Sequence, residues 1–136
     1  MIFIDSWIWL EFFLEDESWK ASEKVIEKLE DEQGVIASTV LLEVRYRINR
    51  KFGGEKADRV TTLINSFDNL EILPVTAEAA IYAADLRRKY YKRDERELSY
   101  ADAIHIAIAS MTECDELYTG DPDFENVDEI QTHIIG

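Results

Sequence analysis

Four carboxylates stand where surface charge is not expected. They are Asp5 in MIFIDSW, Glu43 in TVLLEVRY, Asp102 in LSYADAIH and Asp121 in LYTGDPDF. If the fold gathers them, they repel one another strongly unless a cation joins them. A site of oxygen ligands selects a hard ion, Mg²⁺ or Mn²⁺, which lowers the pKa of bound water and screens charge on phosphate oxygens. The pattern therefore points to metal-assisted chemistry on a phosphate group.

Asp5 and Glu43 each have a simpler structural interpretation. Asp5 is well placed to be the N-cap of a helix that begins near Ser6. Glu43 is four residues before Arg47, in the favourable order for an ion pair on a helix surface. Such a pair contributes only about 0.3 kcal/mol, which is a weak reason to interrupt an apolar stretch.

Asp102 and Asp121 also have local alternatives. Ser99 and Asp102 have the spacing of a capping box, and Asp121 precedes a proline, as the residue before a helix often does. His105 shares a helix face with Asp102 and could join it in binding a metal, although a lone histidine in an apolar helix is more often a satisfied core residue. Asp123 is an alternative to Asp121 as the fourth acid.

Short apolar runs alternate with longer helical patterns along the chain. We expect strands at 1–4, 35–37, 71–73, 116–119 and about 132–135. We expect helices at 6–13 and 55–67. Another is expected to begin at a Ser18 cap and end before Gln33–Gly34, and another to run from a Ser38 or Thr39 cap to 51. The last two should run from Thr76 through the basic residues at 87–93 and from a Ser99 cap to 111. This alternation predicts an α/β sandwich, with a parallel sheet covered by helices on both faces. Parallel strands place their carboxyl ends at one edge, where three of the four acids follow or adjoin a strand.

The composition fits one globular domain, residues 1–136, without a repeat or linker. A single cysteine, Cys114, excludes an internal disulfide. The apolar start lacks a basic leader, and no window approaches 18 apolar residues, so we expect a cytoplasmic protein that does not span a membrane.

The formal net charge of −14 argues against nucleic-acid binding over the whole surface. However, ten of the fifteen basic residues fall within 45–51 and 87–96. These stretches are either a local patch for phosphates or solvated helix faces. With this net charge, a dication must offset repulsion before a phosphate group can approach.

Five aromatic residues fall within thirteen positions near the start of the chain, namely Trp7, Trp9, Phe12, Phe13 and Trp19. A helix as short as 6–13 cannot hide them all. We expect some to lie in the core and the rest to face a partner protein or a second subunit.

Taken together, these stretches resemble the PIN-domain family of metal-dependent ribonucleases, and within it the VapC toxins of prokaryotic toxin–antitoxin pairs. FIDSWIWLEFF is similar to the family's first strand with its leading aspartate, here Asp5 followed by Ser6. STVLLEVRYRI, LSYADAIHIAIA and LYTGDPDF resemble the next three motifs, the last giving Thr119, Asp121 and Phe124. The resemblance covers essentially the whole chain.

The resemblance implies a three-layer α/β/α sandwich with a mainly parallel sheet of about five strands. It implies Mg²⁺ or Mn²⁺ held chiefly by Asp5 and Asp102, with Glu43 and Asp121 completing the catalytic site directly or through water. Ser6, Thr119 and Asp123 would support these carboxylates. The residues expected to contact RNA phosphates are Arg45, Arg47, Arg87, Arg88 and Arg93.

The resemblance further implies an endoribonuclease that cuts single-stranded or looped RNA, is commonly a homodimer, and is neutralised by a small antitoxin. Two alternatives remain open at this point. One is a housekeeping PIN nuclease that processes ribosomal RNA. The other is a catalytically silent PIN-like scaffold.

Overall fold

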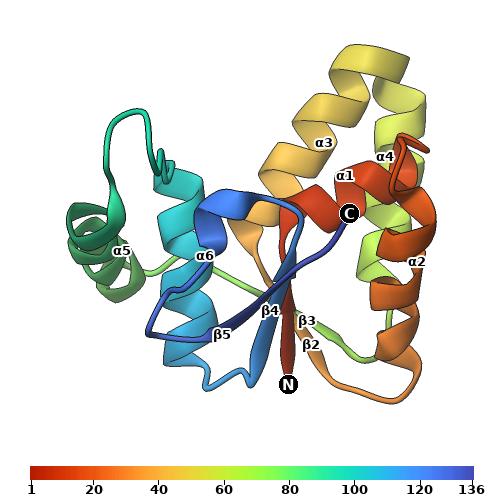
Figure 1. The fold of residues 1–136 in the computed structure, drawn as a ribbon. Coiled ribbons are helices and arrows are strands. Elements are labelled where there is room, and N and C mark those ends of the chain that lie inside the picture. The colour runs from red at the N-terminus through yellow and green to blue at the C-terminus, as the bar shows by residue number, and fades with distance from the viewer.

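The computed structural model describes residues 1–136, which form one five-stranded sheet and its covering helices (Figure 1). All strand pairs are parallel, and the order across the sheet is β3-β2-β1-β4-β5. The strands are β1 (Ile2–Ile4), β2 (Gly34–Ala37), β3 (Leu70–Leu73), β4 (Glu116–Thr119) and β5 (Gln131–Ile134). The predicted α/β class and the predicted five-stranded parallel sheet are confirmed.

Six α-helices and two short 3₁₀ helices connect the strands. The helices are α1 (Ser6–Phe13), α2 (Trp19–Glu27), η1 (Lys28–Glu30), α3 (Ser38–Phe52), α4 (Gly54–Asn65), α5 (Ala77–Tyr90), α6 (Tyr100–Met111) and η2 (Pro122–Phe124). In Figure 1, α5 and α6 cover one face of the sheet and α1 and α2 cover the other, while α3 and α4 form a hairpin that projects beyond the sheet edge. None of the helices combines the length and apolar character needed to cross a lipid bilayer.

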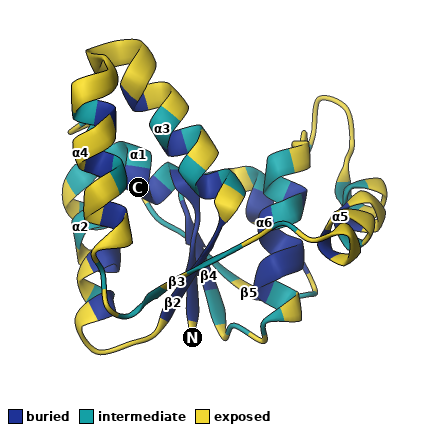
Figure 2. Cartoon of the chain, turned by 180° about the vertical axis from the view of Figure 1, so that it is seen from behind, coloured by how far each residue is buried: buried dark blue, intermediate teal, exposed yellow.

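The core lies around the three central strands. Every residue of β1 and β2 is buried, and so are the last three residues of β4, whereas β3 and β5 at the edges are partly covered. Figure 2 shows this pattern, with buried strands at the centre and exposed outer helix faces. Strands covered on both faces need continuous apolar runs, as in Ile2–Ile4, and that is why these runs predicted strands.

Two of the predicted helix N-caps differ from those in the structure. Thr76 and Ser99 accept hydrogen bonds from backbone N–H groups of α5 and α6, as expected. Ser18 makes no such bond, and α3 has Ala37 at its N-cap position. Because β2 runs directly into α3, no capping residue separates them, and Thr39 is left free for a different contact.

Smaller boundary differences also occur. The predicted helix from Ser18 ends at Glu27 and continues as η1, and the helix expected at 55–67 is Gly54–Asn65. The last strand begins one residue before the predicted 132–135. Within the aromatic segment, Trp9 is fully buried, while the other four rings are half-buried and none is exposed.

Candidate active site

Asp5 is the point at which the central strand β1 turns into α1. Its backbone N–H donates to the Tyr118 carbonyl of β4, and the residue is only 2% exposed. Although Asp5 is at the N-cap position of α1, its carboxylate makes no capping bond. Instead, Oδ2 accepts from the Thr119 hydroxyl and Oδ1 bonds His105 Nδ1, both at 2.8 Å. Asp5 therefore occupies the predicted N-cap position, but its carboxylate does not cap α1 and instead bonds residues of β4 and α6.

His105 is completely buried on α6, and both ring nitrogens have partners. Nε2 lies 2.8 Å from the Thr39 hydroxyl on α3. Burial alone lowers the pKa of His105, but the hydrogen bond and charge of Asp5, with the charges of Glu43 and Asp102, outweigh it and raise that pKa. The sequence-based interpretation of a satisfied core histidine thus describes its contacts well.

Glu43 lies one turn into α3 and faces the same edge. Its Oε1 accepts from Ser6 Oγ at 2.9 Å and lies 3.7 Å from His105 Nε2. Burial raises the pKa of Glu43, although His105, Ser6 and the Arg47 charge oppose that rise. No ion pair joins Glu43 to Arg47, so the surface-pair interpretation is wrong.

Asp102 forms the predicted capping box with Ser99 at the start of α6. Its backbone N–H donates to Ser99 Oγ at 3.0 Å, and its Oδ2 accepts from the Ser99 N–H at 3.2 Å. Burial, followed by the charges of Asp5 and Asp121, raises the pKa of Asp102 to about 7 despite these bonds. The capping role is confirmed. However, capping does not explain why Asp102 lies where burial and neighbouring acids disfavour its ionised form.

Asp121 follows β4 and caps η2, as its position before proline predicted. Its N–H donates to Thr119 Oγ1, and its Oδ1 accepts from the Asp123 N–H. Burial raises the pKa of Asp121, and the charges of Asp123 and Asp5 add to that rise. The charge of Asp121 acts on Asp102, the charge of Asp5 acts on Asp121, and the Asp121 N–H bonds Thr119, so Asp121 fits the fourth position better than Asp123 does.

These residues converge because their elements end or begin at one edge of the sheet. Asp5 and Thr119 end neighbouring strands, and α1, α3 and α6 begin at this edge. Helix N-termini favour negative charge, which partly offsets the crowding of acids. Ligand atoms of Asp5, Asp102 and His105 lie within 4.8 Å of one another. Two of these three donors are carboxylates, and both nitrogens of the third are hydrogen-bonded, so the set fits a hard dication bound through oxygen.

One contact that the sequence did not predict is that of Thr39. Its hydroxyl reaches His105 from the first turn of α3, although its type and position had suggested a helix cap. Its closeness to a strand's carboxyl end, two residues past β2, is the only signal that could have identified Thr39; Thr119 likewise lies at the end of β4.

The predicted RNA-binding arginines are in different environments. Arg45 turns away toward α4, where it pairs with Asp58 and Thr61. Arg87 donates to the Leu98 carbonyl and stacks between the rings of Tyr91 and Tyr100. Arg47, Arg88 and Arg93 are exposed and form no ion pair. The structure does not gather the five arginines into one patch.

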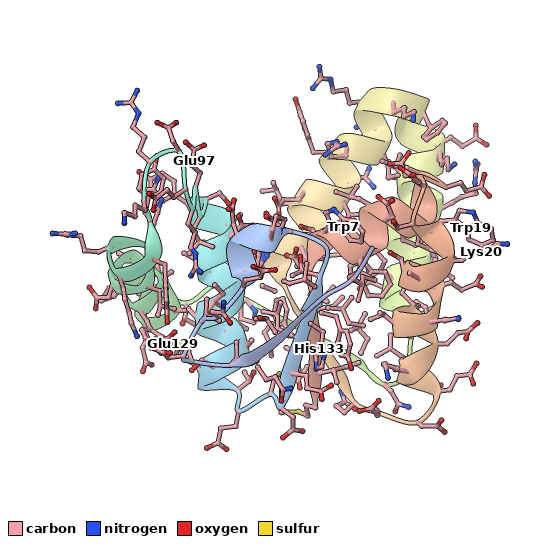
Figure 3. All side chains as sticks on the ribbon, in the orientation of Figure 1. Trp7, Trp19, Lys20, Glu97, Glu129 and His133 are labelled. Carbon is pink, nitrogen blue, oxygen red and sulfur yellow. The ribbon has the colours of Figure 1, made fainter.

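Trp7 sets the position of the Thr119–Asp121 turn. Its indole lies directly against Gly120, and a Cβ added at Gly120 would overlap the ring (Figure 3).

We expect Gly120→Ala to lower the free energy of unfolding by about 1–3 kcal/mol, because Trp7 must move in a packed site. Gly54→Ala is the control, since nothing lies closer than 4.0 Å to a Cβ there. Urea unfolding curves of both variants measure this, and equal stabilities would show that Trp7 moves without cost.

The fold and the site together define a parallel α/β protein with a carboxylate cluster at the carboxyl edge of its sheet. Solved structures share this fold. VapC20 from Mycobacterium tuberculosis, a sarcin-ricin loop cleaving toxin, superposes with a TM-score of 0.77 at 22% identity, over 91% of this chain and 92% of that one. VapBC2 from Rickettsia felis, bound to a promoter DNA fragment, gives 0.73 at 18% identity over 98% of both chains. A toxin-antitoxin complex from Klebsiella pneumoniae gives 0.71 at 18% identity, over 96% and 95%.

The sequence itself matches the family model of the PIN domain over residues 2–130. The chain therefore belongs to the PIN domain family, as the four motifs predicted. A comparison with curated proteins finds no match.

Proposed function

We propose that this protein is a divalent-metal-dependent endoribonuclease. The observation that carries the proposal is the crowding of carboxylates at one sheet edge, where the pKa of Asp102 rises to about 7 because of burial and of the charges of Asp5 and Asp121. Acids that oppose each other's ionisation in this way suit a cation site. Membership of the PIN domain family supports the same conclusion.

In this proposal, Asp5 and Asp102 hold Mg²⁺ or Mn²⁺, and Asp121 completes the site. The bound ion supplies positive charge that screens the phosphate and lowers the pKa of a bound water. Glu43, with one oxygen held by Ser6, orients the attacking water with its other oxygen. Thr119 supports both ends of the site, because it donates to Asp5 and accepts from the Asp121 N–H.

RNA phosphates would be contacted by exposed arginines that no acid neutralises. Arg47, Arg88 and Arg93 meet this condition. Arg45 and Arg87 could contribute only after leaving their present partners, Asp58 and the Tyr91–Tyr100 stack. We therefore rank the first three above the other two.

We further propose that the protein is the toxin of a VapBC-like pair, active in the cytoplasm as a homodimer and neutralised by a small antitoxin. Toxin–antitoxin complexes among the structures of the same fold support this proposal. Half-buried rings at Trp7, Phe12, Phe13 and Trp19 would gain cover from such a partner.

Cleavage of RNA by the purified protein tests the enzymatic proposal. We expect Mg²⁺ or Mn²⁺ to support cleavage of a mixed RNA substrate, EDTA to stop it, and excess Mn²⁺ to restore it. Calcium in place of magnesium is a useful control, because it binds oxygen ligands with a longer and looser geometry. Cleavage that continues unchanged in EDTA would refute metal dependence, and absence of Mn²⁺ binding at millimolar concentration would favour a silent scaffold.

A further inference from the structure

His105 occupies an unusual place for a histidine in an apolar helix. It has no exposed surface, and it lies between two carboxylates that come from different elements. Nδ1 is 2.8 Å from Asp5 Oδ1 at the end of β1. Nε2 is 2.8 Å from Thr39 Oγ1 and 3.7 Å from Glu43 Oε1, both on α3. One side chain of α6 thus joins the end of β1 to α3, two of the other elements that carry acids at this edge.

The contact with Asp5 defines where the ring proton lies. An ionised carboxylate only accepts hydrogen bonds, so His105 Nδ1 must carry the proton in both the neutral and the cationic ring. Nε2 then accepts from the Thr39 hydroxyl in the neutral ring, or donates to it in the cationic ring. Either form preserves the link from Asp5 through His105 to α3.

Asp5 is consequently held at both of its oxygens. Thr119 donates to Oδ2 while His105 donates to Oδ1. These donors lie on different elements, β4 and α6, so the plane of the carboxylate cannot rotate without breaking a buried hydrogen bond. Each oxygen keeps a further lone pair that can bind a cation.

A direct role for His105 as a metal ligand is the competing interpretation. Its ligand atom lies within 4.8 Å of those of Asp5 and Asp102. However, metal ligation requires a nitrogen without a proton, and His105 Nδ1 keeps its proton, which it donates in the hydrogen bond to Asp5. A hard ion would also gain little from exchanging a carboxylate oxygen for this nitrogen.

We propose that His105 is a positioning residue, which fixes the Asp5 carboxylate for metal binding and couples it to Thr39 on α3. This proposal rests on the proposed function in one respect, namely that Asp5 binds the metal. The same residue types could serve packing alone, so the test needs measurements that packing would not affect.

Calorimetric titration with Mn²⁺ separates these roles. We expect His105→Leu, which fills similar space without a donor, to weaken Mn²⁺ binding by about tenfold to a hundredfold. His105→Asn, whose amide can reach the Nδ1 position, should restore most of the affinity, whereas His105→Gln, which reaches toward Nε2, should not. His133→Asn is the matched control, because His133 also lies beside a carboxylate, Glu116, but on β5 and stacked on Tyr118 (Figure 3).

Thermal unfolding in EDTA shows whether each variant is folded before metal is added. Rescue of affinity by Asn but not by Gln, at matched stability, supports positioning. Equal Mn²⁺ affinity in wild type and His105→Leu would overturn the proposal.

Nitrogen-15 spectra of the two histidine rings give a second readout that needs no variant at position 105. We expect His105 Nδ1 to be protonated in the metal-free protein and to remain so in saturating Mg²⁺, with His133→Asn identifying the other ring. Loss of that proton on adding Mg²⁺ would identify His105 as a ligand and overturn the proposal. If wild type binds no Mn²⁺, the proposed function fails with the metal part of this proposal, and the metal-free spectrum still tests the hydrogen bond to Asp5.

Discussion

Replacing Asp5 with asparagine lowers metal-dependent RNA cleavage on the order of a thousandfold while the protein stays folded. The new amide would keep an oxygen for His105, and its nitrogen would donate to Thr119, whose hydroxyl can reverse its role. The substitution therefore removes one negative charge and leaves the hydrogen-bond pattern satisfiable. Initial cleavage rates in saturating Mn²⁺, with circular dichroism as a check on folding, measure this effect.

Asp102→Asn is expected to lose activity to a similar extent, because its carboxylate is the second principal ligand of the proposed site. Its capping box can persist, since an amide oxygen also accepts from the Ser99 N–H. Asp68→Asn is the matched control, as it removes the same charge from an exposed position before β3, at the opposite edge of the sheet. Wild-type cleavage rates in both site variants would disprove the assignment of Asp5 and Asp102.

The second large effect is a pH dependence of metal binding. The pKa of Asp102 in the metal-free protein is raised to about 7 from its ordinary value of 3.8. A proton on Asp102 must leave before a cation can bind, so Mn²⁺ affinity should increase about tenfold between pH 6 and pH 8 and then level off. Calorimetry in buffers of different ionisation enthalpy would count the proton released.

Stability without metal should change in the opposite direction. Because the folded state holds a proton that the unfolded chain gives up, the contribution of Asp102 to stability is fully present below its ordinary pKa of 3.8 and is lost as pH rises through about 7. The raised pKa values of Glu43 and Asp121 act in the same direction. We expect the melting temperature in EDTA to fall from pH 5 to pH 8, saturating Mg²⁺ to reverse the fall, and Asp102→Asn to reduce it. A melting temperature that is independent of pH in EDTA would contradict the crowding of these acids.

Much of the fold could be predicted because its signals are local. The helix 6–13 and the strand 116–119 lie where the apolar patterns placed them, and the capping box of Ser99 and Asp102 is readable from four residues. The meeting of Asp5, Glu43, Asp102 and Asp121 was also predictable, because parallel strands end at a common edge.

The remaining features depend on contacts between distant parts of the chain. Whether Asp5 caps α1 or turns toward His105 is decided by a residue 100 positions away. Arg45 pairs with Asp58 rather than joining a phosphate patch, because the α3–α4 hairpin brings Asp58 beside it. Sequence pattern and spacing cannot distinguish these alternative contacts, because each alternative is consistent with the same local sequence preferences.

The order of strands has a consequence for the protein while it is being synthesised. β1 leaves the ribosome first, yet one of its two neighbours is β4, with Ile4 beside Tyr118. Asp5 gains its Thr119 partner only after β4 has emerged, more than a hundred residues later in the chain. A nascent chain from which β4 has not yet emerged therefore cannot assemble the acidic cluster, and any activity that depends on the cluster begins only after β4 has paired with β1.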